Sequence, residues 1–225
     1  MAAHLWFCLL TGLMALQGYG APGELHSAEA VTGMMRQRLE GLSSLSARYS
    51  VTTYAAVLDR RSETEGRLFL QRDKNLLRLE EADQTIVSDG ESLWTYVHGN
   101  RQVIVSPAQD GAAGARPGRS GRPSRPDDFI FNYSNQYRYD LEGREPVDET
   151  PCYVLGLTAV APTDGIPALR IWVDEGTWLT RKVVYTDDMG SETTLRFKDF
   201  RVNTELPPGL FTMTTPEDVE WVDLR

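Results

Sequence analysis

The sequence predicts a mainly β protein with a few helices (α+β), in which short antiparallel strands form one large curved sheet. Apolar residues alternate in short runs from residue 46 onward, turn residues separate these runs, and helical periodicity is confined to one segment before them. Tight turns between consecutive strands give antiparallel pairing. A sheet of this size must curl to cover its apolar face, so a barrel-like shape is expected.

The first helix is expected directly after Ser27, which can cap its N-terminus. Apolar residues then recur at steps of three and four, which predicts one amphipathic helix that ends near residues 41 to 44. These positions are Val31, Met34, Met35, Leu39, Leu42 and Leu45.

Eleven strands are expected after this helix. Asp89-Gly90, Glu175-Gly176 and the segment from Asp187 to Gly190 lie between consecutive runs, as hairpin turns do. The paired acids Asp187 and Asp188 are read as turn residues rather than as catalytic carboxylates. The strands are expected over residues 46–58, 67–71, 76–80, 84–88, 92–97, 102–106, 137–141, 152–159, 168–174, 179–185 and 192–201.

One segment, residues 108–126, interrupts this pattern. It consists largely of Gly, Pro, Ala and Arg, which predicts a long mobile loop. Four arginines against Asp110 give it a local charge of +3. Two interpretations stay open: contact with an anionic membrane or acidic partner, or a solvated insertion. Residues 127–133 follow with acids and then large apolar side chains, which predicts a short helix lying over the sheet as a lid or plug.

The N-terminus has the features of a secretory signal peptide. Residues 1–20 contain no Lys, Arg, Asp or Glu, and the apolar run from Leu5 to Leu16 is too short to cross a bilayer. Small residues at Gly18 and Gly20 predict cleavage after Gly20, which leaves residues 21–225 as a single domain. A buried N-terminal helix is the alternative.

Composition and charge restrict the function. The chain has 225 residues, 41% of them apolar and 24% charged, which is typical of a globular protein. Its net charge of -9 argues against nucleic acid and acidic substrates as partners, because phosphate binding needs clustered Lys and Arg.

Residues for catalysis or metal binding are scarce. His26 and His98 are isolated from other metal-ligand residues in the sequence. Cys8 would leave with the signal peptide, so Cys152 could form no disulfide within the mature chain. Cys152 is interpreted as a buried thiol rather than a nucleophile, because no base lies near it in sequence. No enzyme activity, metal or cofactor is therefore predicted.

Large apolar side chains are instead abundant on the predicted strands. A curled sheet with a helix across its opening either fills its hollow with side chains or keeps a cavity for an apolar ligand. The spacing of the residues leaves both possibilities open.

Four ordered segments resemble the periplasmic outer-membrane lipoprotein carriers, the LolA-type family. Residues 38–49 resemble that family's first helix and strand, and residues 66–72 its second strand. Residues 88–96, Ser-Asp-Gly-Glu-Ser-Leu-Trp-Thr-Tyr, are similar to its Ser-Asp-Gly-x-x-Leu-Trp-x-Tyr signature. Residues 211–223 are similar to its closing pattern of Phe, Pro, Val and Asp.

The resemblance implies an incomplete antiparallel half-barrel of about eleven strands, lidded by helices, that shelters acyl chains in the periplasm. The implied partners are acylated lipoproteins, an inner-membrane ABC transporter that loads the carrier, and an outer-membrane lipoprotein receptor. The expected state is a monomer. The residues expected to line the lipid-binding cavity are Tyr49, Leu68, Leu70, Leu77, Leu79, Leu93, Trp94, Tyr96 and Trp172.

Arg72 matches the family's functional arginine at the end of the second strand, although Asp73 stands where the family has proline. The resemblance implies that Arg72 controls loading or the lid, through the lid-helix backbone or through Asp127 or Asp128. An exposed arginine without such a role is the alternative. Two other function classes stay open: a lipid- or lipoprotein-sensing regulatory domain of the same fold, and a hydrolase.

Overall fold

The computed structural model describes residues 27–108, 126, 128–131, 137–160 and 166–225. The predicted signal peptide and residues 109–125 of the predicted loop lie outside the described residues. Among the described residues, no helix is long and apolar enough to cross a membrane. The strands are β1 Ser44–Ala55, β2 Arg60–Gln71, β3 Leu76–Glu81, β4 Gln84–Ser88, β5 Ser92–Val97, β6 Gln102–Pro107, β7 Tyr137–Val147, β8 Thr150–Ala159, β9 Ala168–Asp174, β10 Thr180–Thr186, β11 Glu192–Val202 and β12 Glu220–Asp223; the helices are α1 Ala28–Glu40 and α2 Asp128–Phe131.

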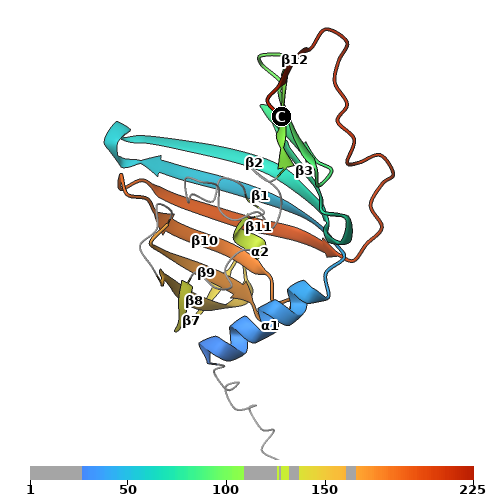
Figure 1. The fold of residues 1–225 in the computed structure, drawn as a ribbon. Coiled ribbons are helices and arrows are strands. Elements are labelled where there is room, and N and C mark those ends of the chain that lie inside the picture. The colour runs from blue at the N-terminus through green and yellow to red at the C-terminus, as the bar shows by residue number, and fades with distance from the viewer. Residues whose placement is uncertain (1–26, 109–125, 127, 132–136, 161–165) are drawn as a thin grey trace, which may run out of the picture.

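Twelve strands of the described chain form one open, bent sheet, which confirms the predicted α+β half-barrel (Figure 1). Their order is β12-β6-β5-β4-β3-β2-β1-β11-β10-β9-β8-β7, so β12 and β7 are the two edges. Two details differ from the expectation of eleven antiparallel strands. A twelfth strand, β12, is present, and it pairs with β6 in parallel. Its four residues are too few to show a strand pattern in the sequence.

The second strand is also longer than predicted. It was expected over residues 67–71 and in fact begins at Arg60. The added residues are mostly charged and exposed, so they carry no apolar alternation. They form a strand because they pair along their whole length with β1, from Ala55 opposite Arg60 to Tyr49 opposite Gly66.

The first helix forms as predicted. Ser27 caps α1, and its Oγ accepts a hydrogen bond from the Ala30 N–H at 3.2 Å. The helix ends at Glu40, with Gly41 as its C-cap. Leu42 lies beyond this end and is buried in the same core as Val31 and Met35.

Both helices lie on one face of the sheet, which we call the inner face (Figure 1). Their buried side chains and the inward side chains of the strands form the main apolar core. The opposite, outer face carries a smaller core of Val147, Cys152, Val154 and Trp172, with Val184 packed against it.

Tyr49 crosses from one strand to another on the inner face. It lies opposite Gly66 of β2, and Gly66 lies opposite Glu81 of β3. The buried phenol ring passes over Gly66, and its hydroxyl donates a hydrogen bond to the Glu81 carboxylate at 2.5 Å. A Cβ at Gly66 would lie 2.5 Å from the ring carbon that bears the hydroxyl and 2.8 Å from the Glu80 carbonyl oxygen. The strand therefore needs glycine at this position.

We expect Gly66→Ala to lower the free energy of unfolding by about 2 kcal/mol, because the added methyl group forces the Tyr49 ring or the β3 backbone to move. Gly33→Ala is the matched control. Gly33 lies inside α1 and has no atom near its missing Cβ, so this change should stabilise the protein by up to about 1 kcal/mol. Urea unfolding curves measure both; equal stability of Gly66→Ala and wild type would contradict the crossing.

Candidate functional site

The inner face brings together five of the predicted cavity residues. Tyr49, Leu68, Leu70, Leu77 and Leu79 are all buried in the main core. Leu68 lies opposite Leu79, and Leu70 lies opposite Leu77, so these four leucines form a continuous apolar patch across β2 and β3.

This apolar surface continues across the other half of the sheet. Tyr153, Leu155 and Leu157 of β8 are buried in the same core. The strand was predicted, but these inner-face residues were not assigned to the cavity. Their spacing of two residues in the sequence is the pattern that indicates a shared face of the strand.

Helix α2 covers part of the inner face. Phe129 and Ile130 are buried in the main core, and the Phe129 ring stacks on that of Tyr185 in β10, with 5.4 Å between the ring centroids. A short helix packed on the sheet was predicted here and is confirmed; its action as a lid or plug stays a prediction. Helix α2 has four residues and α1 has thirteen, so displacing α2 breaks less helical backbone than displacing α1.

Helix α1 covers the inner face through Val31 and Met35, which are buried in the main core. Its contacts with the sheet include β7, the edge strand. Among the described residues, two helices thus cover part of the inner face, and neither is hydrogen-bonded into the strand ladder.

The tyrosines near this edge remain neutral across the physiological pH range. Burial raises the pKa of Tyr139 to about 12, and it also raises the pKa of Tyr137. The Tyr137 hydroxyl donates a hydrogen bond to the Ile166 carbonyl oxygen at 2.9 Å. These two tyrosines therefore add no charge to the inner face at β7.

The apolar inner face extends toward the β12 edge. Leu79 lies opposite Ile86, Ile86 opposite Thr95, and the same row continues through Ile104 to Val222. Ile86 is buried, whereas Ile104 and Val222 are partly exposed. Leu93, another predicted cavity residue, is also partly exposed and packs against the main core. The apolar surface is therefore less covered at this edge.

Trp94 and Tyr96 were predicted to line the cavity with Leu93, but the structure places them on the outer face. Trp94 lies opposite Val87 and Val105, in the row next to the one that contains Leu93. Successive side chains of a strand point to opposite faces, so Leu93 cannot share a face with Trp94 or Tyr96. The sequence signature does not reveal which parity faces inward.

Trp172 also lies on the outer face, for the same reason. Its neighbours Ile171 and Val173 belong to the main core, whereas Trp172 belongs to the smaller outer core. Its indole N–H donates a hydrogen bond to Glu145 at 2.9 Å, and the Lys182 ammonium lies 3.9 Å from the ring centroid. These contacts give Trp172 a structural role on the outer face.

Arg72 lies in the turn between β2 and β3, where its side chain is exposed. Its backbone N–H donates a hydrogen bond to the Ser43 carbonyl oxygen at 2.8 Å. Asp127, one of its predicted partners, and the side chain of Asp128, the other, lie outside the described part of the structure. The role of Arg72 therefore stays a prediction.

A cavity of about 710 Å³ lies beside this turn, between the strand ends and the C-terminal segment, residues 203–219. Ser44 and Gln71 line it and lie opposite each other, one residue beyond the inner-face pair of Leu45 and Leu70. The cavity is therefore on the outer side of the sheet, apart from the inner face.

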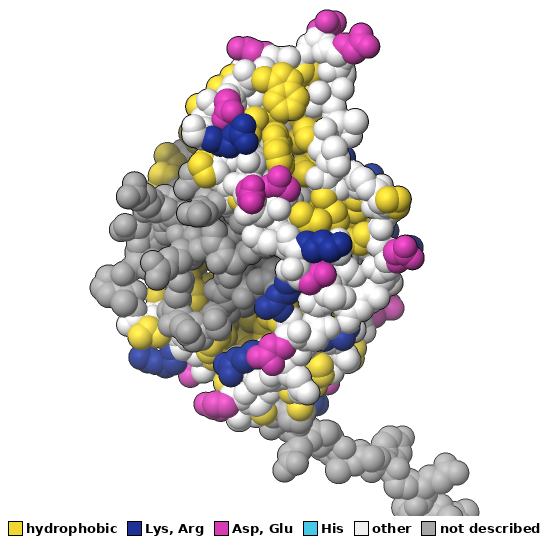
Figure 2. Space-filling model, turned by 45° about the vertical axis from the view of Figure 1, so that its right-hand side comes forward, with side chains coloured by type: hydrophobic (Ala, Val, Ile, Leu, Met, Phe, Trp, Pro, Cys, Tyr) yellow, Lys and Arg dark blue, Asp and Glu magenta, His cyan; other side chains and the backbone are white. Residues whose placement is uncertain are grey.

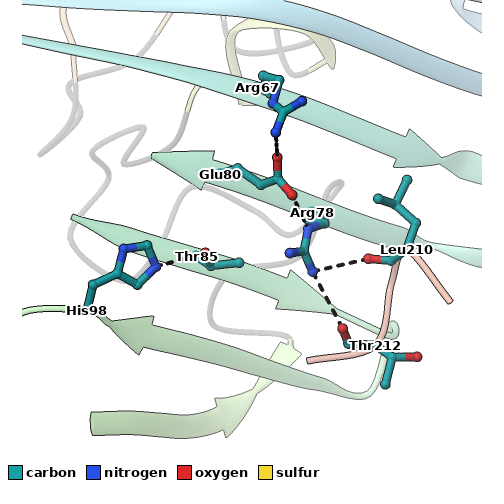
Figure 3. A network of polar contacts seen from close by, with 7 residues as sticks. All are labelled: Arg67, Arg78, Glu80, Thr85, His98, Leu210 and Thr212. Carbon is teal, nitrogen blue, oxygen red and sulfur yellow. Dashed lines mark hydrogen bonds and ion pairs between the residues drawn. The ribbon is translucent and has the colours of Figure 1, made fainter. Parts of the chain in front are cut away.

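The C-terminal segment is held against β3 by Arg78, as Figure 3 shows. One guanidinium nitrogen donates hydrogen bonds to the carbonyl oxygens of Leu210 and Thr212, at 3.2 and 3.5 Å. Glu80 accepts from Arg78 Nε at 2.7 Å and also pairs with Arg67 at 2.7 Å. Figure 2, with this side of the molecule turned forward, shows hydrophobic side chains at the surface between charged ones.

The residues considered for chemistry occupy structural positions. Cys152 is buried in the outer core, and burial raises the pKa of its thiol to about 11, which opposes nucleophilic use. Asp187 accepts hydrogen bonds from the backbone N–H groups of Met189 and Ser191, as a turn residue does. The described residues contain no group of three or more His, Cys, Asp or Glu that could hold a metal ion.

We expect Arg78→Ala to release the C-terminal segment, because hydrogen bonds from a charged donor contribute about 1.5–3 kcal/mol each. Hydrogen exchange at the amides of Leu210 and Thr212 should become faster. Arg67→Ala is the matched control, because Arg67 pairs with the same Glu80 but is exposed and does not contact the segment. Equal exchange in both variants would contradict this role of Arg78.

Comparison with known proteins agrees with the sequence motifs. No family model matches the chain. The chain is 26% identical to an outer-membrane lipoprotein carrier protein of Chromobacterium violaceum, over 96% of this chain and 97% of that one. A solved structure of an uncharacterized conserved protein from Thermus thermophilus covers 85% of this chain and 98% of its own, with a TM-score of 0.57 and 16% identity.

A LolA superfamily protein from Nitrosomonas europaea covers 84% of this chain and 99% of its own, with a TM-score of 0.43 and 15% identity. The Thermus thermophilus structure supports the fold, and the Chromobacterium violaceum match covers the sequence from end to end. Together with the four ordered motifs, the match to a lipoprotein carrier confirms the resemblance of this chain to the LolA-type family.

Proposed function

We propose that the protein is a periplasmic carrier that binds the acyl chains of lipoproteins on its inner face and moves them from the inner to the outer membrane. The observation that carries this proposal is a continuous, largely apolar inner face that, among the described residues, is covered by α1 and α2 rather than by strands. The similarity to a lipoprotein carrier supplies the class of cargo.

Exposing an acyl chain to water has a large free-energy cost, which a carrier avoids. Each methylene transferred from water to an apolar surface contributes about 0.8 kcal/mol, so a sixteen-carbon chain costs on the order of 12 kcal/mol to expose. A carrier without an energy source must also release its cargo. Partly exposed apolar side chains such as Leu93, Ile104 and Val222 at the β12 edge suit both binding and release of an acyl chain better than a deep pocket does.

The inner face as described is the closed state of this carrier. The leucines of β2 and β3 are buried, so an acyl chain must displace part of their cover. Helix α2 is short and contacts the sheet through Phe129 and Ile130, and we assign it as the part that moves. The partly exposed row at the β12 edge offers the chain its first contact.

The remaining parts of the proposal concern partners and location. An inner-membrane ABC complex would load the carrier and an outer-membrane receptor would unload it. Export through a signal peptide cleaved after Gly20 places both events in the periplasm. The protein would act as a monomer and without catalysis, since moving an acyl chain from one apolar surface to another breaks no covalent bond.

Removing the two buried side chains of α2 should strengthen the binding of acyl chains. In the double variant Phe129→Ala/Ile130→Ala, the acyl chain no longer competes with two buried side chains, so we expect the affinity for a fluorescent fatty acid to rise about tenfold or more. Val184→Ala, which removes apolar volume from the outer face, is the control and should leave this affinity unchanged. A fluorescence titration measures both, and weaker binding by the plug variant would contradict the assignment of α2.

Purified protein incubated with a triacylated lipoprotein tests the function itself. A carrier forms a soluble one-to-one complex and passes the lipoprotein to acceptor membranes that contain the receptor. A sensing domain would hold the lipoprotein without transfer, and a hydrolase would change the mass of the lipoprotein.

The variant Arg72→Leu should impair loading or transfer of the lipoprotein if Arg72 controls the lid. Unaltered transfer by this variant would contradict that role.

A further inference from the structure

Exposed apolar side chains gather at the end of the sheet where β1 meets β2 and β10 meets β11. Tyr54, Val57, Leu58 and Met189 have relative exposures of 44%, 78%, 73% and 59%. Val57 and Leu58 belong to the 3₁₀ turn between β1 and β2, and Met189 belongs to the turn between β10 and β11.

The two turns lie side by side, at the left of Figure 1. Strand β1 pairs with β11 up to Tyr54 opposite Glu192, so the turns that continue from these strands are neighbours. A Cβ on Gly190 would lie 4.0 Å from that of Ala56. The four side chains therefore form one surface, which we call the turn patch.

The acids of these turns are engaged in fixing their shape. Asp59 accepts a hydrogen bond from the Tyr54 hydroxyl at 2.8 Å. Asp187 accepts two backbone hydrogen bonds within its own turn, each at 2.9 Å. Both turns are thus held by internal contacts, which leaves the apolar side chains of Val57, Leu58 and Met189 pointing to solvent.

Two arginines follow the patch directly. Arg60 and Arg61 are exposed, and neither forms an ion pair with a carboxylate of the described chain. Protruding apolar side chains beside free guanidinium groups are typical of protein surfaces that enter the interface of a lipid bilayer. Because Asp59, Asp187 and Asp188 lie in the same turns, apolar insertion rather than net charge must supply most of the attraction.

We propose that the turn patch docks the protein transiently on the surface of a phospholipid bilayer, with Val57, Leu58 and Met189 inserted among the lipid headgroups. A bilayer fits the shape of the patch better than a protein partner does. Four side chains on two narrow turns fall well short of the roughly 800 Å² that each partner buries in a specific protein interface. A bilayer can accept protruding side chains one by one. This docking is independent of whether the inner face binds acyl chains.

Flotation with vesicles of phosphatidylethanolamine and phosphatidylglycerol tests the proposal. We expect wild-type protein to float with the vesicles, and the double variant Val57→Ser/Leu58→Ser to lose at least about tenfold in partitioning, because each inserted Val or Leu contributes about that factor or more. Leu224→Ser is the matched control: Leu224 is 63% exposed but lies at the opposite end of the sheet, beside the end of β6. It should float like wild type.

A second measurement reads insertion directly. Leu58→Cys carrying an environment-sensitive dye should show a blue shift and increased emission with vesicles, while Cys152 stays unlabelled because it is buried. Bilayer docking would be contradicted if the wild-type protein did not float, or if the double variant floated as well as wild type. A dimer that depends on Leu58, seen in sedimentation velocity, would also contradict it. Fatty-acid binding in solution, measured on the same variants, should be unchanged, so a failure here is distinguishable from failure of the carrier function.

Discussion

The structure depends on one constraint: a single bent sheet has an apolar inner face that its own strands cannot cover. A closed barrel or a second sheet would bury that face permanently. In this protein the edges β12 and β7 stay apart, and in the described part of the chain the helices that cover the inner face are α1 and α2. Burial of the inner face is therefore tied to helices whose displacement breaks side-chain contacts but no strand pairing.

The two faces of the sheet have different roles, the proposed ligand contact on the inner face and structural support on the outer face. The inner face is largely apolar and continuous, which suits reversible contact with an apolar ligand. The outer face has its own small core, a tryptophan held by Lys182 and Glu145, and a C-terminal segment fixed by Arg78. These contacts stabilise the sheet from its outer face, independently of the packing on the inner face.

Tyr49 illustrates how residues far apart in the sequence are fitted together. Its ring is long enough to cross β2 and reach Glu81 of β3, but only because Gly66 leaves the space. The crossing connects three strands of the inner face with one partly buried hydrogen bond. It also removes a hydroxyl group from competition with an apolar ligand.

The sequence by itself determined most of the architecture. Its alternation and turn residues locate the strands except β12, the charged first half of β2 and the second half of β7, residues 142–147, and Ser27 and Gly41 locate the ends of α1. Its motifs indicate the family. It did not determine which face Leu93, Trp94, Tyr96 and Trp172 occupy, because alternation defines two faces without saying which one meets the helices. Only the tertiary structure decided that, through the pairing register and the side on which α1 and α2 pack. The short parallel strand β12 and the neighbouring turns at Ala56 and Gly190 were likewise decided by contacts between distant segments, which leave no local periodicity in the chain.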